Sequence, residues 1–270
     1  MPLAVCATPI GNLADVTLRV LDELGQADLV LCEDTRRTRI LLERHGIEAR
    51  LASYHRHNEA ARASQTIDRL RAGDRIALVS DAGLPGINDP GARLIAAAVA
   101  EGLEVTVLPG PSAVETALVV SGFAVERYRF VGYLPRRPAE LRELARDVAA
   151  WPDAVVAFES PSRLRRSLAA LAEELPERDG AVCRELTKRY EEVTRGTLAE
   201  LATRFSEPAR GEITLVVGPG GSVTRATAAD DAARRAVAEL VEAGASRRRA
   251  AEIVSRLTGS SRNALYRDSL

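Results

Sequence analysis

The stretch that decides the fold is RIALVSDAGLPGINDPG, residues 75–91. Its first six residues, RIALVS, contain the short apolar run IALV, which is typical of a buried strand, and a long loop rich in proline, glycine and aspartate comes next. The loop leads into a helix predicted over residues 90–100, which a proline opens and Gly102 ends. Because the loop is longer than a simple turn requires, and because ligands of α/β sheets bind beyond strand carboxyl ends, it predicts a ligand site.

The same alternation of strand and helix extends on both sides of this stretch. Further strands are predicted at residues 3–7, 28–32, 50–53 and 104–108, and further helices at residues 16–24, 35–45 and 59–71. Alternation of this kind indicates a mostly parallel sheet with helices on both of its faces.

A second α/β unit begins near residue 127. Its strands are predicted at residues 129–134, 153–158, 181–186, 191–195 and 213–217, with helices at residues 138–150, 163–175 and 198–205. The fold class is therefore α/β, with two α/β lobes over residues 1–122 and 123–221.

The remaining residues, 222–270, form a helical tail. A flexible glycine-rich break over residues 218–222 precedes three short helices predicted at residues 230–242, 247–257 and 263–269. Three helices with glycine-bearing turns resemble a helix-turn-helix module, which would contact RNA. A plain helical cap or a dimer contact is the alternative. So short a segment is small for an independent core, so we expect it to pack on the lobes.

Composition limits the class of protein. The chain has 270 residues, of which 46% are hydrophobic and 28% charged, which is typical of a folded globular protein. The net charge of −1 gives no overall basic field, but Lys188 is the sole lysine among 37 basic residues, and the arginines cluster. Arginine binds phosphate bidentately, so these clusters predict local RNA contacts; an arginine-rich composition on solvated helix faces is the alternative.

Several classes are excluded by what the sequence lacks. No apolar run is long enough to cross a bilayer, and the N-terminal residues lack the basic start of a signal peptide, so we expect a cytoplasmic protein without membrane contact. Three distant cysteines give neither a disulfide framework nor a metal motif, and we expect no metal. No G-x-G-x-x-G turn and no Walker-type lysine loop occurs, which disfavours nicotinamide-dependent and P-loop enzymes.

Three loops at strand carboxyl ends carry proline and glycine. They are ATPIGNLAD at residues 7–15, the 81–91 loop, and LPGPSA at residues 108–113, where Ser112 is the predicted N-cap of a helix. A helix start offers free backbone N–H groups to a carboxylate or another polar ligand edge. The three loops therefore predict one shared crevice.

The longer motifs resemble a known family. ATPIGNLAD, CEDTRRTRILL, SDAGLPGINDPG, LPGPSA, FESPSRL and CRELTKRYEE occur in this order, and the resemblance extends continuously from Leu3 to Pro219. Together with the arginine-rich tail they resemble the ribosomal RNA small-subunit methyltransferase I family, within the tetrapyrrole methylase-like (class III) enzymes. The resemblance implies S-adenosylmethionine bound between two lobes of a homodimer. It also implies 2′-O-methylation of a decoding-region cytidine in 16S rRNA, with the small ribosomal subunit as partner.

The resemblance also implies a set of cofactor contacts. The first lobe would supply Pro9, Asp81, Gly83, Leu84, Ile87, Ser112 and Ala113, and the second lobe Glu159, Leu186 and Pro219.

Candidate catalytic residues are suggested by the chemistry of methyl transfer to a hydroxyl, which a nearby base or cation assists. Lys188 is the main candidate, because an amine can lose its proton when desolvated; a surface lysine paired to Glu191 or Glu192 is the alternative. Glu33 would receive a sugar hydroxyl, and Asp34 is expected to cap a helix. Candidate substrate contacts are basic side chains near the cleft: Arg36, Arg37, His55, His57, Arg163 and Arg166.

Two rival functions remain open from the sequence. A methyltransferase of the same fold acting on a precursor corrin would use the arginines for carboxylates instead of phosphates. A non-catalytic nucleic-acid-binding regulator would use the tail as its reader and take up no cofactor.

Overall fold

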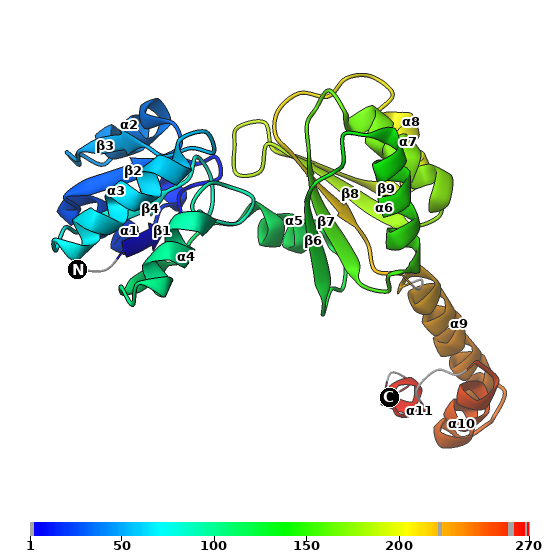
Figure 1. The fold of residues 1–270 in the computed structure, drawn as a ribbon. Coiled ribbons are helices and arrows are strands. Elements are labelled where there is room, and N and C mark those ends of the chain that lie inside the picture. Colours follow the sequence, from blue (N-terminus) through cyan, green and yellow to red (C-terminus); the bar gives the residue numbers. More distant parts are fainter. Residues whose placement is uncertain (1–2, 221–222, 259–261, 268, 270) are drawn as a thin grey trace.

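The computed structural model describes residues 3–220, 223–258, 262–267 and 269. It contains two sheets, each covered by helices, and a helical tail (Figure 1). The predicted fold class of two α/β lobes is confirmed. No helix of these residues is long and apolar enough to span a bilayer.

The first sheet has five parallel strands in the order β3-β2-β4-β1-β5. Their bounds are β1 Leu3–Cys6, β2 Leu29–Cys32, β3 Leu51–Ser53, β4 Ile76–Val79 and β5 Val105–Leu108. The helices are α1 Leu18–Gln26, α2 Thr35–Arg44, α3 Glu59–Arg71 and α4 Ala92–Ala100, with a short 3-10 helix, η1, at Leu13–Asp15. The prediction of a mostly parallel first sheet is confirmed.

Helices cover both faces of this sheet. On one face Leu3, Leu31 and Leu78 pack with residues of α3 and α4, and on the other Val30 and Val79 pack with residues of α1 and α2. A strand buried on both faces needs apolar side chains in both directions, which explains the unbroken apolar run IALV of β4.

The second sheet is mixed, in the order β6-β7-β10-β8-β9. Only β6 and β7 are parallel, whereas β10 is antiparallel to both β7 and β8, and β8 is antiparallel to β9. The strands are β6 Tyr128–Tyr133, β7 Ala154–Glu159, β8 Asp179–Arg184, β9 Glu192–Thr197 and β10 Ile213–Val217. One face packs on α6 Pro138–Ala150, α7 Leu164–Glu174 and α8 Leu198–Arg204.

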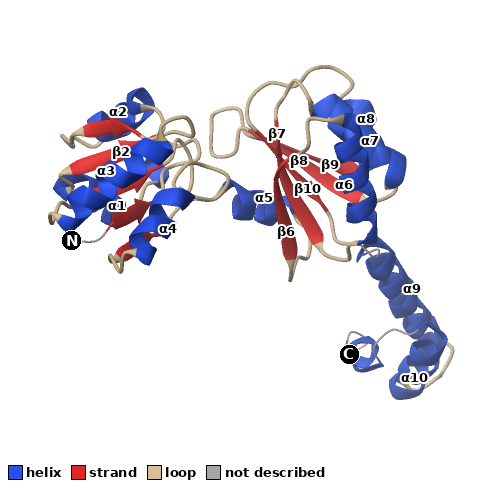
Figure 2. Ribbon diagram, in the orientation of Figure 1, coloured by secondary structure: helices blue, strands red, loops and turns tan. Residues whose placement is uncertain are grey.

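The opposite face of the second sheet is covered by α5, Ala113–Ser121. Val114, Ala117 and Leu118 of this helix pack on strand residues of the second sheet, and Ile10 of the first lobe joins the same cluster. The sequence places α5 within the predicted lobe 1–122. In the structure this helix packs on the second sheet instead of the first. Figure 2 shows this helix beside the second sheet, next to the loops that lead from the first.

The tail contains α9 Val223–Glu242, α10 Arg247–Thr258 and α11 Arg262–Arg267. Its described buried side chains form a cluster of their own: Ala233, Val237, Ala250, Ala251, Val254 and Leu265. The expectation that the tail packs on the lobes is wrong, because α9 is 20 residues long, starts before the predicted residue 230, and leads away from them (Figure 1). The predicted break at residues 218–222 lies partly outside the described residues.

Candidate active site

The carboxyl ends of β1, β4 and β5 come together as predicted. Thr8 and Gly83 exchange backbone hydrogen bonds of 2.8 and 3.0 Å, which join the first loop to the 81–91 loop. Gly83 has φ +77°, a conformation that glycine adopts at low cost, and its ideal Cβ position lies 3.7 Å from the carbonyl oxygen of Pro111 in the third loop. The three loops therefore form one wall.

A cavity of about 800 Å³, called the large cavity from here on, lies between this wall and the second lobe. Apolar and aromatic side chains such as Leu84, Phe130 and Phe158 line much of it, and the rings of the two phenylalanines pack edge to face at 5.0 Å. Of the residues predicted to bind cofactor, seven line this cavity: Gly83, Leu84, Ile87, Ser112, Ala113, Glu159 and Leu186.

Ser112 stands at the N-cap position of α5, but its side chain does not cap the helix. Its hydroxyl donates to the carboxylate of Glu115 instead, and the hydroxyl of Tyr128 donates to the same carboxylate at 2.5 Å. The start of α5 thus borders the large cavity without a cap from Ser112, and helix starts favour carboxylates and other anions.

Glu159, at the end of β7, is almost fully buried and held from within the second lobe. Its carboxylate accepts hydrogen bonds from the Ser160 backbone N–H at 2.6 Å and from the Ser167 hydroxyl, and pairs with Arg163. The Arg163 guanidinium also donates to the Leu134 carbonyl at 3.2 Å. Arg163 was predicted to bind RNA, but its position makes it part of this buried network.

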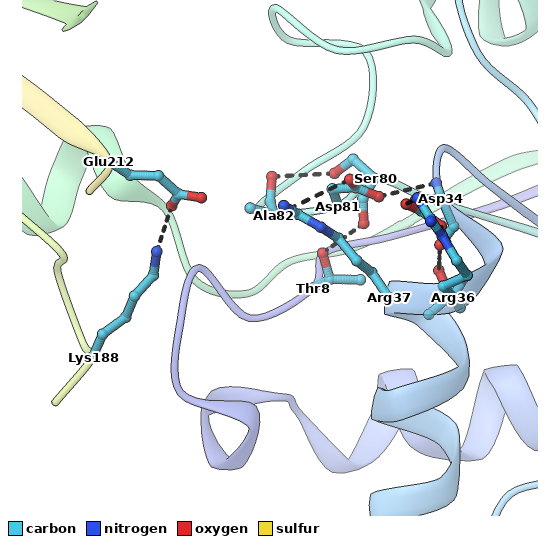
Figure 3. Close-up of polar contacts among 10 residues, drawn as sticks. Thr8, Asp34, Arg36, Arg37, Ser80, Asp81, Ala82, Lys188 and Glu212 are labelled. Carbon is cyan, nitrogen blue, oxygen red and sulfur yellow. Dashed lines mark hydrogen bonds and ion pairs between the residues drawn. The ribbon is translucent and has the colours of Figure 1, made fainter. Parts of the chain in front are cut away.

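A second cavity, of about 260 Å³ and called the small cavity from here on, adjoins the large one. Its lining is more polar and includes Arg37, Asp81 and Lys188. Figure 3 shows Lys188 and Glu212 of the second lobe opposite Ala82, Asp81 and Arg37 of the first. Both cavities are lined by Ile10, Ala82 and Glu212, so they meet at these three residues.

Three predicted cofactor residues lie elsewhere. Pro9 and Asp81 line the small cavity instead of the large one. Asp81 accepts a hydrogen bond from the Asp34 backbone N–H at 3.0 Å and faces Arg37 at 3.5 Å. The expectation that Pro219 lies at the cleft is wrong: β10 runs antiparallel to β7, so its Ile213 pairs with Glu159 at the cavity while Pro219 lies beyond the opposite end.

Lys188 does line the small cavity, but it is paired. Its Nζ atom lies 3.0 Å from Glu185 and 2.9 Å from Glu212, not beside Glu191 or Glu192. Burial alone would lower the pKa of Lys188, but the hydrogen bonds and charges of Glu212 and Glu185 outweigh it and raise this pKa. The expectation that desolvation frees the amine to act as a base is therefore wrong, and Lys188 is a cation.

The loop that carries Lys188 presses against the first lobe. Its Thr187 hydroxyl accepts a hydrogen bond from the Asn12 backbone N–H at 3.0 Å, and a Cβ added to Gly11 would lie 2.8 Å from the Leu186 carbonyl oxygen. Glu185 and Thr187 have φ values of +50° and +64°, a strained conformation that surrounding contacts must hold. This contact between lobes fixes where Lys188 points.

The other predicted substrate residues line neither cavity; four of them follow β2 and β3, whereas Arg166 lies in α7 of the second lobe. Asp34 caps α2 as expected, and Arg36 pairs with it, which lowers the pKa of Asp34 to about 2. Burial, and then the charge of Asp81, raise the pKa of Glu33. His55 and His57 pack edge to face at 5.9 Å. Arg166 is exposed and donates to the Arg136 carbonyl at 2.8 Å.

Several polar residues that line the large cavity were not predicted from the sequence, and three of them stand out. Asp89 is one; burial, and then the charges of Glu33 and Asp81, raise its pKa to about 6. Glu212 and Thr214, at the start of β10, are the others. Asp89 belonged to a quoted motif, whereas only the antiparallel direction of β10 brings Glu212 and Thr214 to the cleft. No group of three or more potential metal ligands occurs among the described residues.

The comparisons with known proteins agree with this architecture. The family of tetrapyrrole (corrin/porphyrin) methylases matches residues 2–202. The chain is 42% identical over 268 residues to ribosomal RNA small subunit methyltransferase I of Mesorhizobium japonicum, covering 98% of this chain and 90% of the relative. It is 43% identical over 216 residues to the protein of the same name from Bacillus subtilis, covering 80% and 74%.

The chain belongs to the tetrapyrrole methylase family. Within it, the chain groups with the ribosomal RNA small subunit methyltransferase I proteins, as the sequence motifs predicted. Solved structures of the tetrapyrrole methylase fold include the methyltransferase CobJ, with a TM-score of 0.62, 23% identity and coverage of 81% of this chain and 94% of CobJ. Another is uroporphyrin-III C-methyltransferase of Thermus thermophilus complexed with S-adenyl homocysteine, with a TM-score of 0.57, 17% identity and coverage of 81% and 97%.

The cofactor that methyltransferases of this family use fits the large cavity. The volume of the large cavity falls within the range of about 300–1,000 Å³ that is usual for small-molecule and cofactor sites. Its aromatic residues Phe130 and Phe158 suit the flat faces of a nucleobase, and the uncapped start of α5 suits a carboxylate.

Proposed function

We propose that this protein is an S-adenosylmethionine-dependent methyltransferase that acts on the 2′-hydroxyl of a decoding-region cytidine in 16S rRNA. The observation that carries the proposal is the pair of cavities that meet at Ile10, Ala82 and Glu212. The large one has the size and lining for a nucleoside cofactor, and the small one has polar groups for a nucleotide. The names of the relatives support ribosomal RNA as the substrate rather than a corrin.

The chain's own residues would hold the reactants in line. When bound, the cofactor supplies an electrophilic methyl group, so positioning accounts for much of the rate. Backbone N–H groups of Ser112 and Ala113 would bind its carboxylate, and Gly83 and Leu186 would line its two sides. Pro9, Asp81 and Arg37 would surround the target nucleotide in the small cavity.

RNA would reach this cavity over an arginine-bearing surface. Arg36 is 86% exposed at its side chain, and Arg37 60%, so both remain open to phosphate although each faces an aspartate. We include Glu33, His55 and His57 as contacts around them, and Arg166 as a separate contact on α7 of the second lobe. The arginines of α10, residues 247–249, are exposed too, and the tail, residues 222–270, would bind RNA beyond the two lobes, 1–122 and 123–221.

We further propose that the protein works in the cytoplasm as a homodimer. Analytical ultracentrifugation tests the second part of this proposal, and a single species at 29.0 kDa would contradict it.

Methyl transfer itself is the main test. Small ribosomal subunits from a strain lacking this protein should accept labelled methyl groups from S-adenosylmethionine, and mapping should place the label on one cytidine ribose. A precursor corrin should accept none. Transfer to the corrin instead, or nucleic-acid binding without cofactor uptake, would contradict the proposal. RNA affinity should fall steeply with salt, because arginine–phosphate contacts release counterions.

A further inference from the structure

Glu212 occupies a position that no other ionisable residue shares among those that the structure describes. Of the three residues that line both cavities, Ile10 and Ala82 are apolar, so Glu212 is the single carboxylate where the two cavities meet. A methyl group that passes from one cavity to the other has to pass this junction. Its side chain is 62% exposed, so a ligand can reach the carboxylate.

The backbone of Glu212 is locked against the Lys188 loop. Its N–H donates to the Glu185 carboxylate at 2.8 Å, and its carbonyl accepts from the Glu185 N–H at 2.9 Å. Gly211 makes this approach possible: it has φ +84°, and a Cβ there would lie 2.5 Å from Cγ of Glu185. The backbone of Glu212 is thus held at the junction by short contacts from its own lobe.

Lys188 holds the side chain of the same residue. Its Nζ atom lies 2.9 Å from Oε2 of Glu212. Because the ammonium group carries its full set of protons, it donates and cannot accept, whereas the carboxylate can accept. Figure 3 shows this pair facing the first lobe across the small cavity.

The other carboxylates around the site are less suited to meet the reacting hydroxyl. Asp81 lines only the small cavity, and its oxygens already face the Asp34 N–H and Arg37. Glu159 lines only the large cavity and is buried in its own network with Arg163. Asp89 and Glu115 also line only the large cavity.

We propose that Glu212 accepts the proton of the hydroxyl that is methylated, and that Lys188 holds the Glu212 carboxylate in place. This inference rests on the proposed function. The ribose oxygen forms a bond to the methyl carbon while the carbon–sulfur bond breaks, the electron pair of that bond remains on sulfur, and the hydroxyl proton passes to Glu212. Solvent then takes the proton from the exposed carboxylate.

The first test measures single-turnover methylation of small ribosomal subunits by the full-length protein. Glu212→Gln keeps the shape of the side chain but removes the carboxylate that accepts the proton, so the methylation rate should fall about 100-fold or more. Glu212→Asp retains a carboxylate and should retain part of the rate. Calorimetry should find S-adenosylhomocysteine affinity within about threefold of the unchanged protein, which also shows that the variant is folded. Glu207→Gln, at an exposed residue outside both cavities, is the matched control and should match the unchanged protein.

The second test does not depend on activity. Because Lys188 is the sole lysine, ¹³C-lysine labelling gives one side-chain signal from this protein. Its titration should move to lower pH in Glu212→Gln, since a carboxylate that raises the Lys188 pKa is lost. Glu207→Gln should leave the titration in place.

The outcomes separate the two proposals. If the unchanged protein methylates subunits and Glu212→Gln does so within threefold of the same rate, the role of Glu212 is contradicted and the proposed function stands. An unchanged lysine titration in Glu212→Gln would contradict the pairing. If the unchanged protein transfers no methyl group to RNA, the proposed function fails, and the role of Glu212 fails with it.

Discussion

The two sheets of this protein differ in which strand ends they bring to the site. In the first sheet all five strands are parallel, so every strand carboxyl end lies at one edge, and the loops after β1, β4 and β5 form a single wall. In the second sheet β10 runs against its neighbours, so the cleft receives the end of β7 but the start of β10. Strand direction therefore decides which residues reach the site.

This difference explains which of the residues named from the sequence line the large cavity. Strand-end reasoning placed the 81–91 and 108–113 loops at one crevice, and the family resemblance named Gly83, Leu84 and Ser112 within them. All three line the large cavity, because their strands are parallel. The resemblance also placed Pro219 at the cleft and did not include Glu212, but β10 runs antiparallel to β7, so its start and not its end reaches the cleft. Substitutions at the two kinds of strand end test this difference between the sheets.

Arg163→Met should have the largest effect, which is a loss of stability of the second lobe alone. It leaves the buried Glu159 carboxylate without its ion pair, which costs about 3–5 kcal/mol in the free energy of unfolding. Trp151, the single tryptophan, lies in the second lobe and reports its unfolding in urea by fluorescence. Arg166→Met, at an exposed arginine of the same helix, should change this free energy by less than about 0.5 kcal/mol. Equal effects would show that the buried pair contributes nothing specific.

Lys188→Ala should reduce turnover about 10- to 100-fold, because it removes one of the cations that line the small cavity and releases Glu212. Affinity for S-adenosylhomocysteine should change less than about twofold, since Lys188 does not line the large cavity. Single-turnover kinetics and calorimetry check the two parts. If the variant has normal turnover, or mainly loses cofactor affinity, then the assignment of the cofactor to the large cavity and of the reacting nucleotide to the small one is contradicted.

Ala113→Leu and Pro219→Ala compare the two strand directions directly. A larger side chain at Ala113 fills part of the large cavity at the start of α5, so S-adenosylhomocysteine affinity should fall about tenfold. Pro219 lies beyond the far end of β10, so its substitution should leave this affinity unchanged. Calorimetry on both variants is sufficient. If S-adenosylhomocysteine binding is weakened in Pro219→Ala alone, then the far end of β10, and not the start of α5, lies at the cofactor site.

Asp89→Asn should have the smallest effect, which is a change in how the stability of the first lobe depends on pH. The Asp89 carboxyl has a folded-state pKa of about 6 against an ordinary value of 3.8, so ionising it favours the unfolded chain. Stability should therefore fall as pH rises from about 4 to about 6, by about 1–2 kcal/mol after allowing for partial exposure. Urea unfolding at several pH values should show a weaker fall in Asp89→Asn. An identical pH dependence in both proteins would contradict the burial of this carboxyl.

The family, the α/β class and the first wall of the site follow from the sequence alone. Those features are local: an apolar run such as IALV, continued by a loop such as SDAGLPGINDPG, specifies a buried strand and the ligand loop at its carboxyl end. The tertiary structure decided the rest. It set the direction of β10, moved α5 onto the second sheet, placed Lys188 between Glu185 and Glu212, and buried Arg163. These depend on contacts between residues far apart in the chain, which periodicity and motif spacing do not contain.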